Sequence, residues 1–262
     1  METILNLKDI HFVRSDIQIL SNISFEIKKN ESLAILGKNG SGKTTLINLI
    51  YGFLWPTSGQ ICFLNKNYGE FQLKELQKKI GYLQPQIWED RLQKNINIHD
   101  VILTGIDSSF GIYRDYNKTE LAKVNSCIEE NLSWIKNPYL FFFKCSSGER
   151  KKILLLRAKL SNPEIYILDE PCSSLDLTSK YEFLKFTKKI LENKNLILVT
   201  HSVDEILPNI NKTLLLKDGK ILQFGDTEKI LTEENLKICY DIPLFLEKKN
   251  NTYSVQFQYE QI

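Results

Sequence analysis

The segment GKNGSGKTT has the residue types and spacing of a phosphate-binding loop, G-x-x-x-x-G-K-[ST], between an apolar strand and an amphipathic helix. Glycines let such a loop turn sharply and aim successive N–H groups at an anion, and the following helix N-terminus adds a favourable field for negative charge. Lys43 is expected to reach the β and γ phosphates of a nucleotide, and Thr44 to hold Mg²⁺. The residues expected to contact the nucleotide are Gly37, Lys38, Asn39, Gly40, Ser41, Gly42, Lys43, Thr44 and Thr45.

The segment IYILDEP is an apolar run that ends in two acids, Asp169 and Glu170. An Asp at the carboxyl end of a buried strand beside a phosphate loop can bind Mg²⁺, directly or through water, and the adjacent Glu can orient an attacking water. The guanine-reading motif N-K-x-D does not occur in the chain. The sequence therefore favours an ATP site with Mg²⁺.

The segment CSSGERKKILLL has two interpretations. Ser146 and Glu149 have the spacing of a capping box at the start of a helix, which needs no function. The same stretch can be a phosphate-contacting signature of an ATPase that works as a dimer. The two interpretations are compatible, because a free helix N-terminus is also an anion site.

Strands and helices alternate along the chain, which favours an α/β core. Strands are predicted at ILNLKDIHF, QILSNISFEI, ESLAIL, KKIGYLQ, EIYILDE and NLILVTH, and a strand pair is predicted around Asn65-Lys66-Asn67. Asp218-Gly219, between TLLLK and KILQF, predicts a hairpin.

Helices are predicted at TTLINLIYG, from Ser146 to about Leu160, and over SKYEFLKFTKKILENK. Residues 90–140 are predicted to be helical, and Asn117 and Glu120 have the spacing of a second capping box within them. A helical insertion therefore interrupts the α/β core.

The composition limits the classes of partner and compartment. The chain has 262 residues with 34 Lys and Arg against 32 Asp and Glu, so no nucleic-acid partner is expected. Its five cysteines are scattered and include no C-x-x-C, which favours a reducing compartment. The N-terminus has no signal-peptide core, and no apolar run approaches the roughly 18 residues of a membrane span. We expect a soluble, cytoplasmic chain.

The order of the motifs resembles one family. A phosphate loop, a Gln after a strand, a helical insertion, CSSGE, ILDEP, SSLD and LVTH follow one another as in the nucleotide-binding subunits of ABC transporters, over nearly the whole chain. The segments HDVILTG, DEPCSSLD and VTHSVDEI are similar to the importer-type subgroup labelled for molybdate or iron-complex uptake.

The resemblance implies a fold and a division of the chain. It implies a P-loop NTPase (RecA-like) core sheet with an N-terminal antiparallel β part and an inserted α-helical subdomain. The ATPase domain would cover residues 1–228, with the core at 1–88 and 148–228 and the helical subdomain at about 89–147. Residues 229–262 would form a C-terminal extension.

The resemblance also implies residue roles. Asp169 would be the Mg²⁺-linked acid, Glu170 the catalytic carboxylate and His201 the switch residue that contacts the γ phosphate. Residues 173–176 would couple two sites, with Asp176 near the nucleotide. Two copies would place each ATP between the phosphate loop of one and the signature of the other, whose residues are Ser146, Ser147, Gly148 and Glu149.

Three positions depart from the pattern of the family. Arg14 stands where an aromatic residue often stacks on adenine, and a guanidinium plane can also stack on a base. The Gln that would join catalysis and Mg²⁺ binding is Gln84 or Gln86, and we prefer Gln86 because the usual motif ends in Pro-Gln. In the signature, Cys145 and Ser147 replace the more common Leu and Gly.

We therefore predict an ATP-hydrolysing subunit of an ABC transporter of the importer type, which works as a homodimer with a separate integral membrane subunit. The expected location is cytoplasmic, at the inner face of the cell membrane. One alternative is a soluble ABC ATPase that acts as an assembly switch, for example in iron-sulfur assembly. Another is a nucleotide-binding module that does not hydrolyse ATP.

Overall fold

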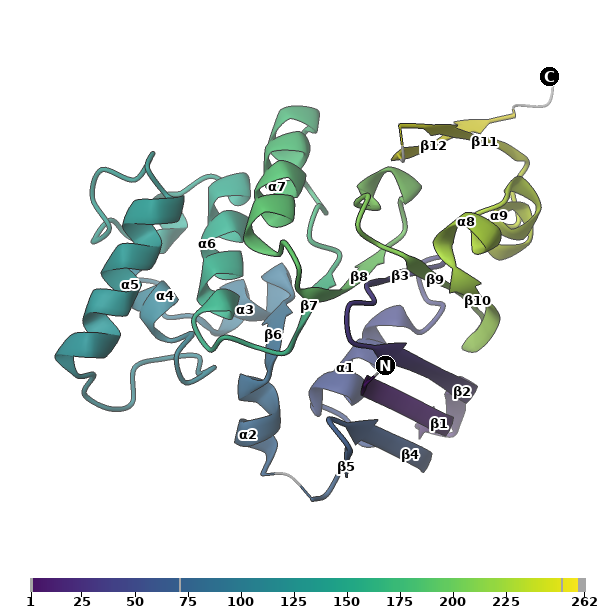
Figure 1. Ribbon diagram of the computed structural model, residues 1–262, viewed down its shortest axis with the longest axis horizontal. Coiled ribbons are helices and arrows are strands. Elements are labelled where there is room, and N and C mark those ends of the chain that lie inside the picture. The colour runs from purple at the N-terminus through teal and green to yellow at the C-terminus, as the bar shows by residue number, and fades with distance from the viewer. Residues whose placement is uncertain (1, 71, 251, 259–262) are drawn as a thin grey trace. The chain divides into compact units, whose positions relative to one another are not determined.

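Strands and helices alternate along the chain (Figure 1), which divides into two units. The computed structural model describes residues 2–70, 72–250 and 252–258. The first unit comprises Met1–Leu73, Ile167–Glu170 and Asn193–Ile262, and the second comprises Lys74–Tyr166 and Pro171–Glu192. The helical subdomain predicted at about 89–147 lies within the second unit.

The first unit contains an antiparallel sheet of β1 (Thr3–Arg14), β2 (Ile17–Lys28), β4 (Ser58–Phe63) and β5 (Lys66–Asn67), in the order β2-β1-β4-β5. Alternating apolar residues of β1 and β2 are buried, as a sheet with one covered face requires. The strand pair predicted around Asn65 exists, but its turn lies earlier. Leu64 and Asn65 have φ of 49° and 61°, so Lys66 and Asn67 already belong to β5.

A second sheet forms the core of the first unit. In it β10 (Lys220–Asp226), β9 (Lys212–Lys217), β3 (Leu33–Leu36), β8 (Asn195–Thr200) and β7 (Ile165–Asp169) are neighbours in that order. β3 runs parallel to both β8 and β9, and every residue of β3, β7 and β8 is buried. The hairpin predicted at Asp218-Gly219 joins β9 to β10 and is confirmed. The parallel strands therefore end at one edge, where polar residues follow them.

Helix α1 (Lys43–Tyr51) follows β3, and the last part of the first unit continues beyond β10. It consists of α8 (Thr227–Ile230), α9 (Glu233–Tyr240) and a hairpin of β11 (Leu244–Lys249) and β12 (Thr252–Phe257). Leu236, Cys239, Leu244 and Tyr253 from these elements are buried. The described part of the predicted C-terminal extension thus packs both on itself and on β9 and β10.

The second unit is mostly helical. It contains α2 (Leu73–Lys78), β6 (Ile80–Leu83), α3 (Pro85–Arg91), α4 (Ile98–Leu103), α5 (Lys118–Asn131), the 3-10 helix η1 (Phe142–Lys144), α6 (Ser147–Lys159) and α7 (Leu177–Ile190). Both capping boxes predicted from the sequence, at Asn117 and at Ser146, are confirmed. Within the described residues, no helix has the length and apolar character needed to span a bilayer.

The prediction that residues 90–140 are helical is right for α4 and α5 but wrong for the residues around them. Residues 104–117 form turns and irregular chain, as do residues 132–141. Gly105 and Gly111 favour turns in the first stretch, and Pro138 favours an irregular path in the second. The apolar spacing of α5 was therefore a better guide than the helical trend of the whole segment.

A buried arginine joins the elements of the second unit. Arg157 of α6 lies over the Trp88 ring, with its guanidinium carbon 3.6 Å from the ring centroid. Its Nε donates to Thr104 Oγ1 at 3.0 Å and its Nη2 to the Ser109 carbonyl at 2.7 Å. Gly105 lies against the same residue, because a Cβ there would be 2.0 Å from the Arg157 carbonyl oxygen. Only glycine fits this close approach.

We expect Gly105→Ala to lower the free energy of unfolding by about 1–3 kcal/mol, the usual cost of overpacking. Urea denaturation measures the change. Gly111→Ala is the control, since a Cβ there would meet only the Tyr113 ring at 3.3 Å, and that side chain is 81% exposed. Its effect should stay within about 0.5 kcal/mol. Equal effects of the two substitutions would contradict the packing role of Gly105.

Candidate active site

The loop Gly37–Gly42 joins the end of β3 to the start of α1. A Cβ on Gly37 would lie 2.2 Å from the Leu216 carbonyl oxygen, so the loop passes too close to β9 for any side chain. Gly42 precedes α1 with φ of 101°, in the left-handed region, and no side chain caps the helix. The N-terminal amides of α1 therefore remain available to an anion.

The side chain of Lys43 is folded into this loop. Its Nζ donates to the Gly37 carbonyl at 2.7 Å and to the Lys38 carbonyl at 2.9 Å, and lies 3.8 Å from Glu170 Oε1. The side chain is 6% exposed. Burial lowers the pKa of Lys43, and the charges of Glu170 and Asp169 oppose that effect. The cation is thus held at the centre of the loop by groups that phosphate oxygens can replace.

The hydroxyl of Ser41, in the same loop, is buried without a hydrogen-bond partner among the described residues. Buried hydroxyl groups normally have a partner. A phosphate oxygen in the loop would supply one, so the loop fits the group that its sequence predicts.

Two acids follow at the end of β7. Asp169 is 1% exposed, and burial raises the pKa of its carboxyl from 3.8 to about 6, although a hydrogen bond from the Thr44 side chain lowers it. Glu170 has φ of 48°, a strained conformation for a non-glycine residue, and its N–H donates to the Val199 carbonyl at 2.9 Å. This bond holds the turn that points Glu170 toward the loop.

His201 follows β8 and completes the cluster. Its Nδ1 lies 2.7 Å from Glu170 Oε2, and its side chain is 51% exposed. The first unit therefore brings together Lys43, Thr44, Asp169, Glu170 and His201, which were predicted from three separate motifs. Two carboxylates, an imidazole and an ammonium group beside a glycine loop can bind a phosphate chain and orient a water.

Other predicted residues of the first unit lie at the surface. Lys38, Asn39 and Gly40 are exposed, and so is Arg14 at the end of β1. The stacking role of Arg14 stays a prediction.

The second unit holds Gln84, Gln86, the signature and Asp176. The Tyr82 hydroxyl donates to Gln84 Oε1 at 2.7 Å, and Gln86 Nε2 lies 3.4 Å from Ser173 Oγ. These contacts do not decide which Gln has the family role, so our preference for Gln86 stays a prediction. Lys151 donates to the Ser173 carbonyl, which ties α6 to the loop before α7.

The signature begins α6 with a reciprocal cap. The Ser146 N–H donates to Glu149 Oε2 at 2.8 Å, and the Glu149 N–H donates to Ser146 Oγ at 3.3 Å. A Cβ on Gly148 would lie 3.3 Å from Ser179 Cβ, so a small residue is needed there. Asp176 caps α7 through the Ser179 N–H at 2.7 Å, and this hydrogen bond lowers the pKa of Asp176.

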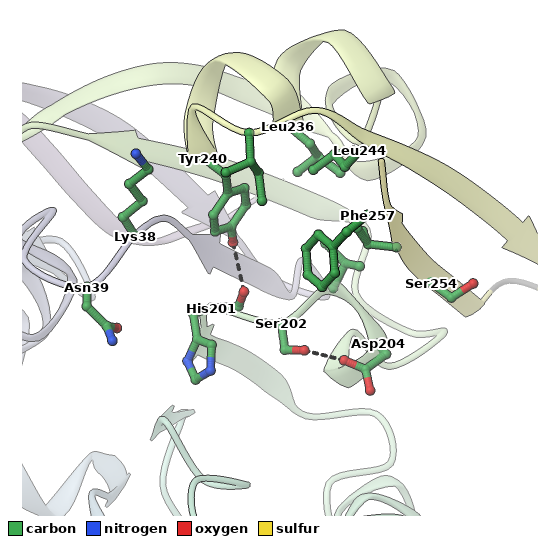
Figure 2. A pocket seen from close by; sticks show the side chains of 13 residues that line it. Lys38, Asn39, His201, Ser202, Asp204, Leu236, Tyr240, Leu244, Ser254 and Phe257 are labelled. Atoms are coloured by element: carbon green, nitrogen blue, oxygen red, sulfur yellow. Dashed lines mark hydrogen bonds between the residues drawn. The ribbon is translucent and has the colours of Figure 1, made fainter. Parts of the chain in front are cut away.

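Two residues near the cluster were missed from the sequence. The Tyr240 hydroxyl donates to the His201 carbonyl at 3.0 Å (Figure 2). Asp241 Oδ2 accepts from Lys38 at 2.8 Å. The second contact joins residues 203 positions apart. No motif marks them, so only the folded chain reveals them.

The comparisons with known proteins decide the family. The ABC transporter family matches residues 20–173 of the chain. An uncharacterized ABC transporter ATP-binding protein of Lactococcus lactis, YmeB, is 34% identical over 258 residues, which are 97% of this chain and 98% of that one. The chain belongs to the ABC transporter ATP-binding proteins. Its ATPase activity and its phosphate-loop α/β fold, both predicted from the sequence, are confirmed at the level of this family.

Two further relatives extend the similarity of this ABC subunit. The spermidine/putrescine import ATP-binding protein PotA of Borreliella afzelii is 31% identical over 245 residues, covering 91% of this chain and 67% of that one. A solved structure described as a metal-chelate type ABC transporter in an inward-facing conformation matches with a TM-score of 0.76 at 25% identity. That match covers 98% of this chain and 97% of the other.

The raised pKa of Asp169 predicts how pH affects the stability of the ABC subunit. The folded state binds this proton more tightly than the unfolded state, so stability falls as pH rises from about 4 to 6. Above pH 6 the buried carboxylate costs up to about 3 kcal/mol. Asp169→Asn removes this cost and should gain thermal stability relative to the parent between pH 4 and pH 8, while losing ATPase activity.

Thermal unfolding of both proteins at pH 4, 6 and 8, without nucleotide, measures the difference. Asp218→Asn, at an exposed hairpin turn, is the control and should show no such trend. A difference between Asp169→Asn and the parent that stays constant across this range would contradict the raised pKa.

Proposed function

We propose that this ABC subunit couples ATP-driven association of two copies to import through a separate membrane protein, at the cytoplasmic face of the cell membrane. The observation that carries the proposal is the cluster of Lys43, Glu170 and His201 beside the phosphate loop. The name of PotA, which specifies import, supports the direction of transport.

Glu170 would act as the catalytic carboxylate. Its contact with His201 Nδ1 leaves the carboxylate oriented at the loop, where it can accept a proton from a water. Lys43 would exchange the carbonyls of Gly37 and Lys38 for oxygens of the β and γ phosphates. His201 would contact the γ phosphate and hold Glu170 in place.

The metal of the proposed reaction is Mg²⁺. No group of three or more His, Cys, Asp or Glu side chains in the described ranges could hold a metal ion. A nucleotide-bound Mg²⁺ needs fewer protein ligands, because phosphates and waters supply the rest. Thr44 and Asp169, which are hydrogen-bonded to each other, fit this need, and Gln86 is the third proposed ligand. The ion would neutralise charge on the phosphate oxygens.

The signature would bind the ATP held by a second copy. The start of α6, with Ser146, Ser147, Gly148 and Glu149, would suit an anion through the amides that the reciprocal cap does not use. Asp176 would lie near the same nucleotide. Arg14, exposed at the end of β1, would stack on the adenine through its guanidinium plane.

A membrane partner would dock on the second unit around residues 86–113. This range contains two apolar segments, IHDVILTG and FGIY, which differ in their burial. Ile98, Val101, Ile102 and Leu103 are buried within the second unit, because α4 packs against α5 and α6. Ile112 and Tyr113 are 46% and 81% exposed and remain available. The proposed contact is therefore with the FGIY segment.

Site-directed crosslinking tests the membrane partner. A Tyr113→Cys subunit, produced in its native cells and treated with a short bifunctional thiol reagent in membranes, should crosslink to an integral membrane protein. Glu129→Cys, on the exposed face of α5, is the control and should not. Recovery of both variants only in complexes without a membrane protein would favour the soluble assembly switch instead.

The Ser146→Asp substitution tests the signature separately from the helix cap. Asp caps a helix about as well as Ser, so stability should change by no more than about 0.5 kcal/mol. Like charges about 4 Å apart repel by roughly 4 kcal/mol at an effective dielectric of 20, enough to suppress closure on the partner's ATP about a thousandfold. We expect a stable subunit that binds ATP and does not hydrolyse it.

Asn117→Asp is the matched control, because Asn117 forms the same capping box on α5. Both variants should keep the stability of the parent, measured by thermal unfolding, and only Ser146→Asp should lose ATPase activity. Normal hydrolysis by stable Ser146→Asp would leave the capping box as the whole role of Ser146.

A further inference from the structure

The last turn of α9 contacts the phosphate loop at Lys38 and the proposed switch residue, His201. The Tyr240 hydroxyl donates to the His201 carbonyl at 3.0 Å. The next residue, Asp241, accepts from Lys38 at 2.8 Å and from Lys217 at 2.6 Å. Two neighbouring residues of the C-terminal segment therefore contact two separate parts of the ATP site.

The position of these two residues is fixed by the packing of α9. Leu236 and Cys239 of this helix are fully buried, and Thr232 caps its start by accepting from the Asn235 N–H at 3.2 Å. Asp241 ends the helix with φ of 52° in the left-handed region. Lys217 also donates to the Ile238 carbonyl at 2.7 Å, which fastens the last turn to β9.

The hydroxyl of Tyr240 acts as a hydrogen-bond donor. Burial raises the pKa of Tyr240, so the group is a neutral hydroxyl. It donates to the His201 carbonyl, and the next residue, Asp241, accepts from Lys38. The last turn of α9 thereby joins His201 to Lys38 of the phosphate loop.

The switch segment has open space on its other side. Residues 201–204 line a cavity of about 560 Å³, together with Tyr240 and apolar residues of the β11–β12 hairpin (Figure 2). No side chain of the described residues fills this space, so packing by that part of the chain does not restrain His201 from this direction. The hydrogen bond from Tyr240 is placed where it can supply that restraint.

We propose that Tyr240 is a positioning residue for ATP hydrolysis, which fixes the main chain of His201 to the last turn of α9, and that Asp241 assists by holding Lys38 of the phosphate loop. This inference rests on the switch role proposed for His201. Because His201 Nδ1 is 2.7 Å from Glu170, a displaced His201 would also displace the carboxylate that orients the water.

Tyr240→Phe removes the hydroxyl and keeps the ring. We expect kcat for ATP to fall about 2- to 10-fold, the scale of one lost hydrogen bond, with the KM for ATP within about 2-fold. Asp241→Asn releases Lys38 of the loop and should mainly raise the KM, about 2- to 5-fold. A general loss of structure would not lower mainly kcat in Tyr240→Phe and raise mainly KM in Asp241→Asn.

The controls make the same chemical changes in the same segment. Tyr253→Phe alters another buried tyrosine, on β12, and Glu228→Gln removes the exposed pair with Lys248. Steady-state ATPase of the purified full chain, normalised to nucleotide sites titrated with ATP, is measured with thermal unfolding for all variants. Both controls should keep kcat and KM within about 1.5-fold of the parent.

His201→Ala in the same series separates failure of the inference from failure of the proposed function. If His201→Ala loses activity and Tyr240→Phe keeps the kcat of the parent, the positioning role is wrong and the switch stands. If His201→Ala itself keeps that kcat, the switch role fails and the inference fails with it. Equal losses of kcat and thermal stability in Tyr240→Phe and Tyr253→Phe would show a structural effect only and would also overturn the positioning role.

Discussion

The buried ammonium group of Lys43 is the constraint on which the rest of the first unit depends. A cation that is 6% exposed is costly unless charged and polar groups compensate it. Here the carbonyls of Gly37 and Lys38 and the carboxylate of Glu170 do so. The loop can aim its carbonyls at Nζ only because Gly37 passes within contact of β9, where a side chain would collide with the Leu216 carbonyl.

The two acids near Lys43, Asp169 and Glu170, are also held in states that are unfavourable in free energy. The left-handed backbone of Glu170 is strained, and the carboxyl of Asp169 is buried enough to raise its pKa to about 6. Such costs persist where the surrounding structure holds a group in place for a function. The metal ion of a bound nucleotide would offset the cost of the buried Asp169 carboxylate, because it would place positive charge beside it. The arrangement is therefore that of a ligand site, in which a bound ligand would balance charge that the chain itself leaves unbalanced.

Local patterns predicted much of this arrangement. The phosphate loop, the acidic pair, both capping boxes and the hairpin at Asp218-Gly219 each depend on a few adjacent residues, and the fold has them where the sequence indicated. Helical character over residues 90–140 was overestimated, since a general trend carries less information than a cap and a regular apolar spacing. Burial of IHDVILTG could not be predicted, because an amphipathic segment does not show whether its own unit or a partner covers it.

Contacts between distant parts of the chain set the other limit. Tyr240 and Asp241 meet His201 and Lys38 only because α9 packs beside β9, and no spacing in the sequence encodes that meeting. The choice between Gln84 and Gln86, at the start of α3, depends on which of the two side chains meets a bound nucleotide. The sequence therefore indicates residues that form a turn or a cap more clearly than residues whose roles require a ligand or a second copy of the chain.

The most direct test of the account is single-turnover ATP hydrolysis by Glu170→Gln, measured beside nucleotide binding on the same preparation. The amide keeps the shape of the side chain and cannot accept the proton of the attacking water. We predict ATP affinity within about 2-fold of the parent and hydrolysis slower by about 10²-fold or more, the scale of a lost acid-base group. Hydrolysis at the rate of the parent would show that Glu170 is only an acid at the end of a strand.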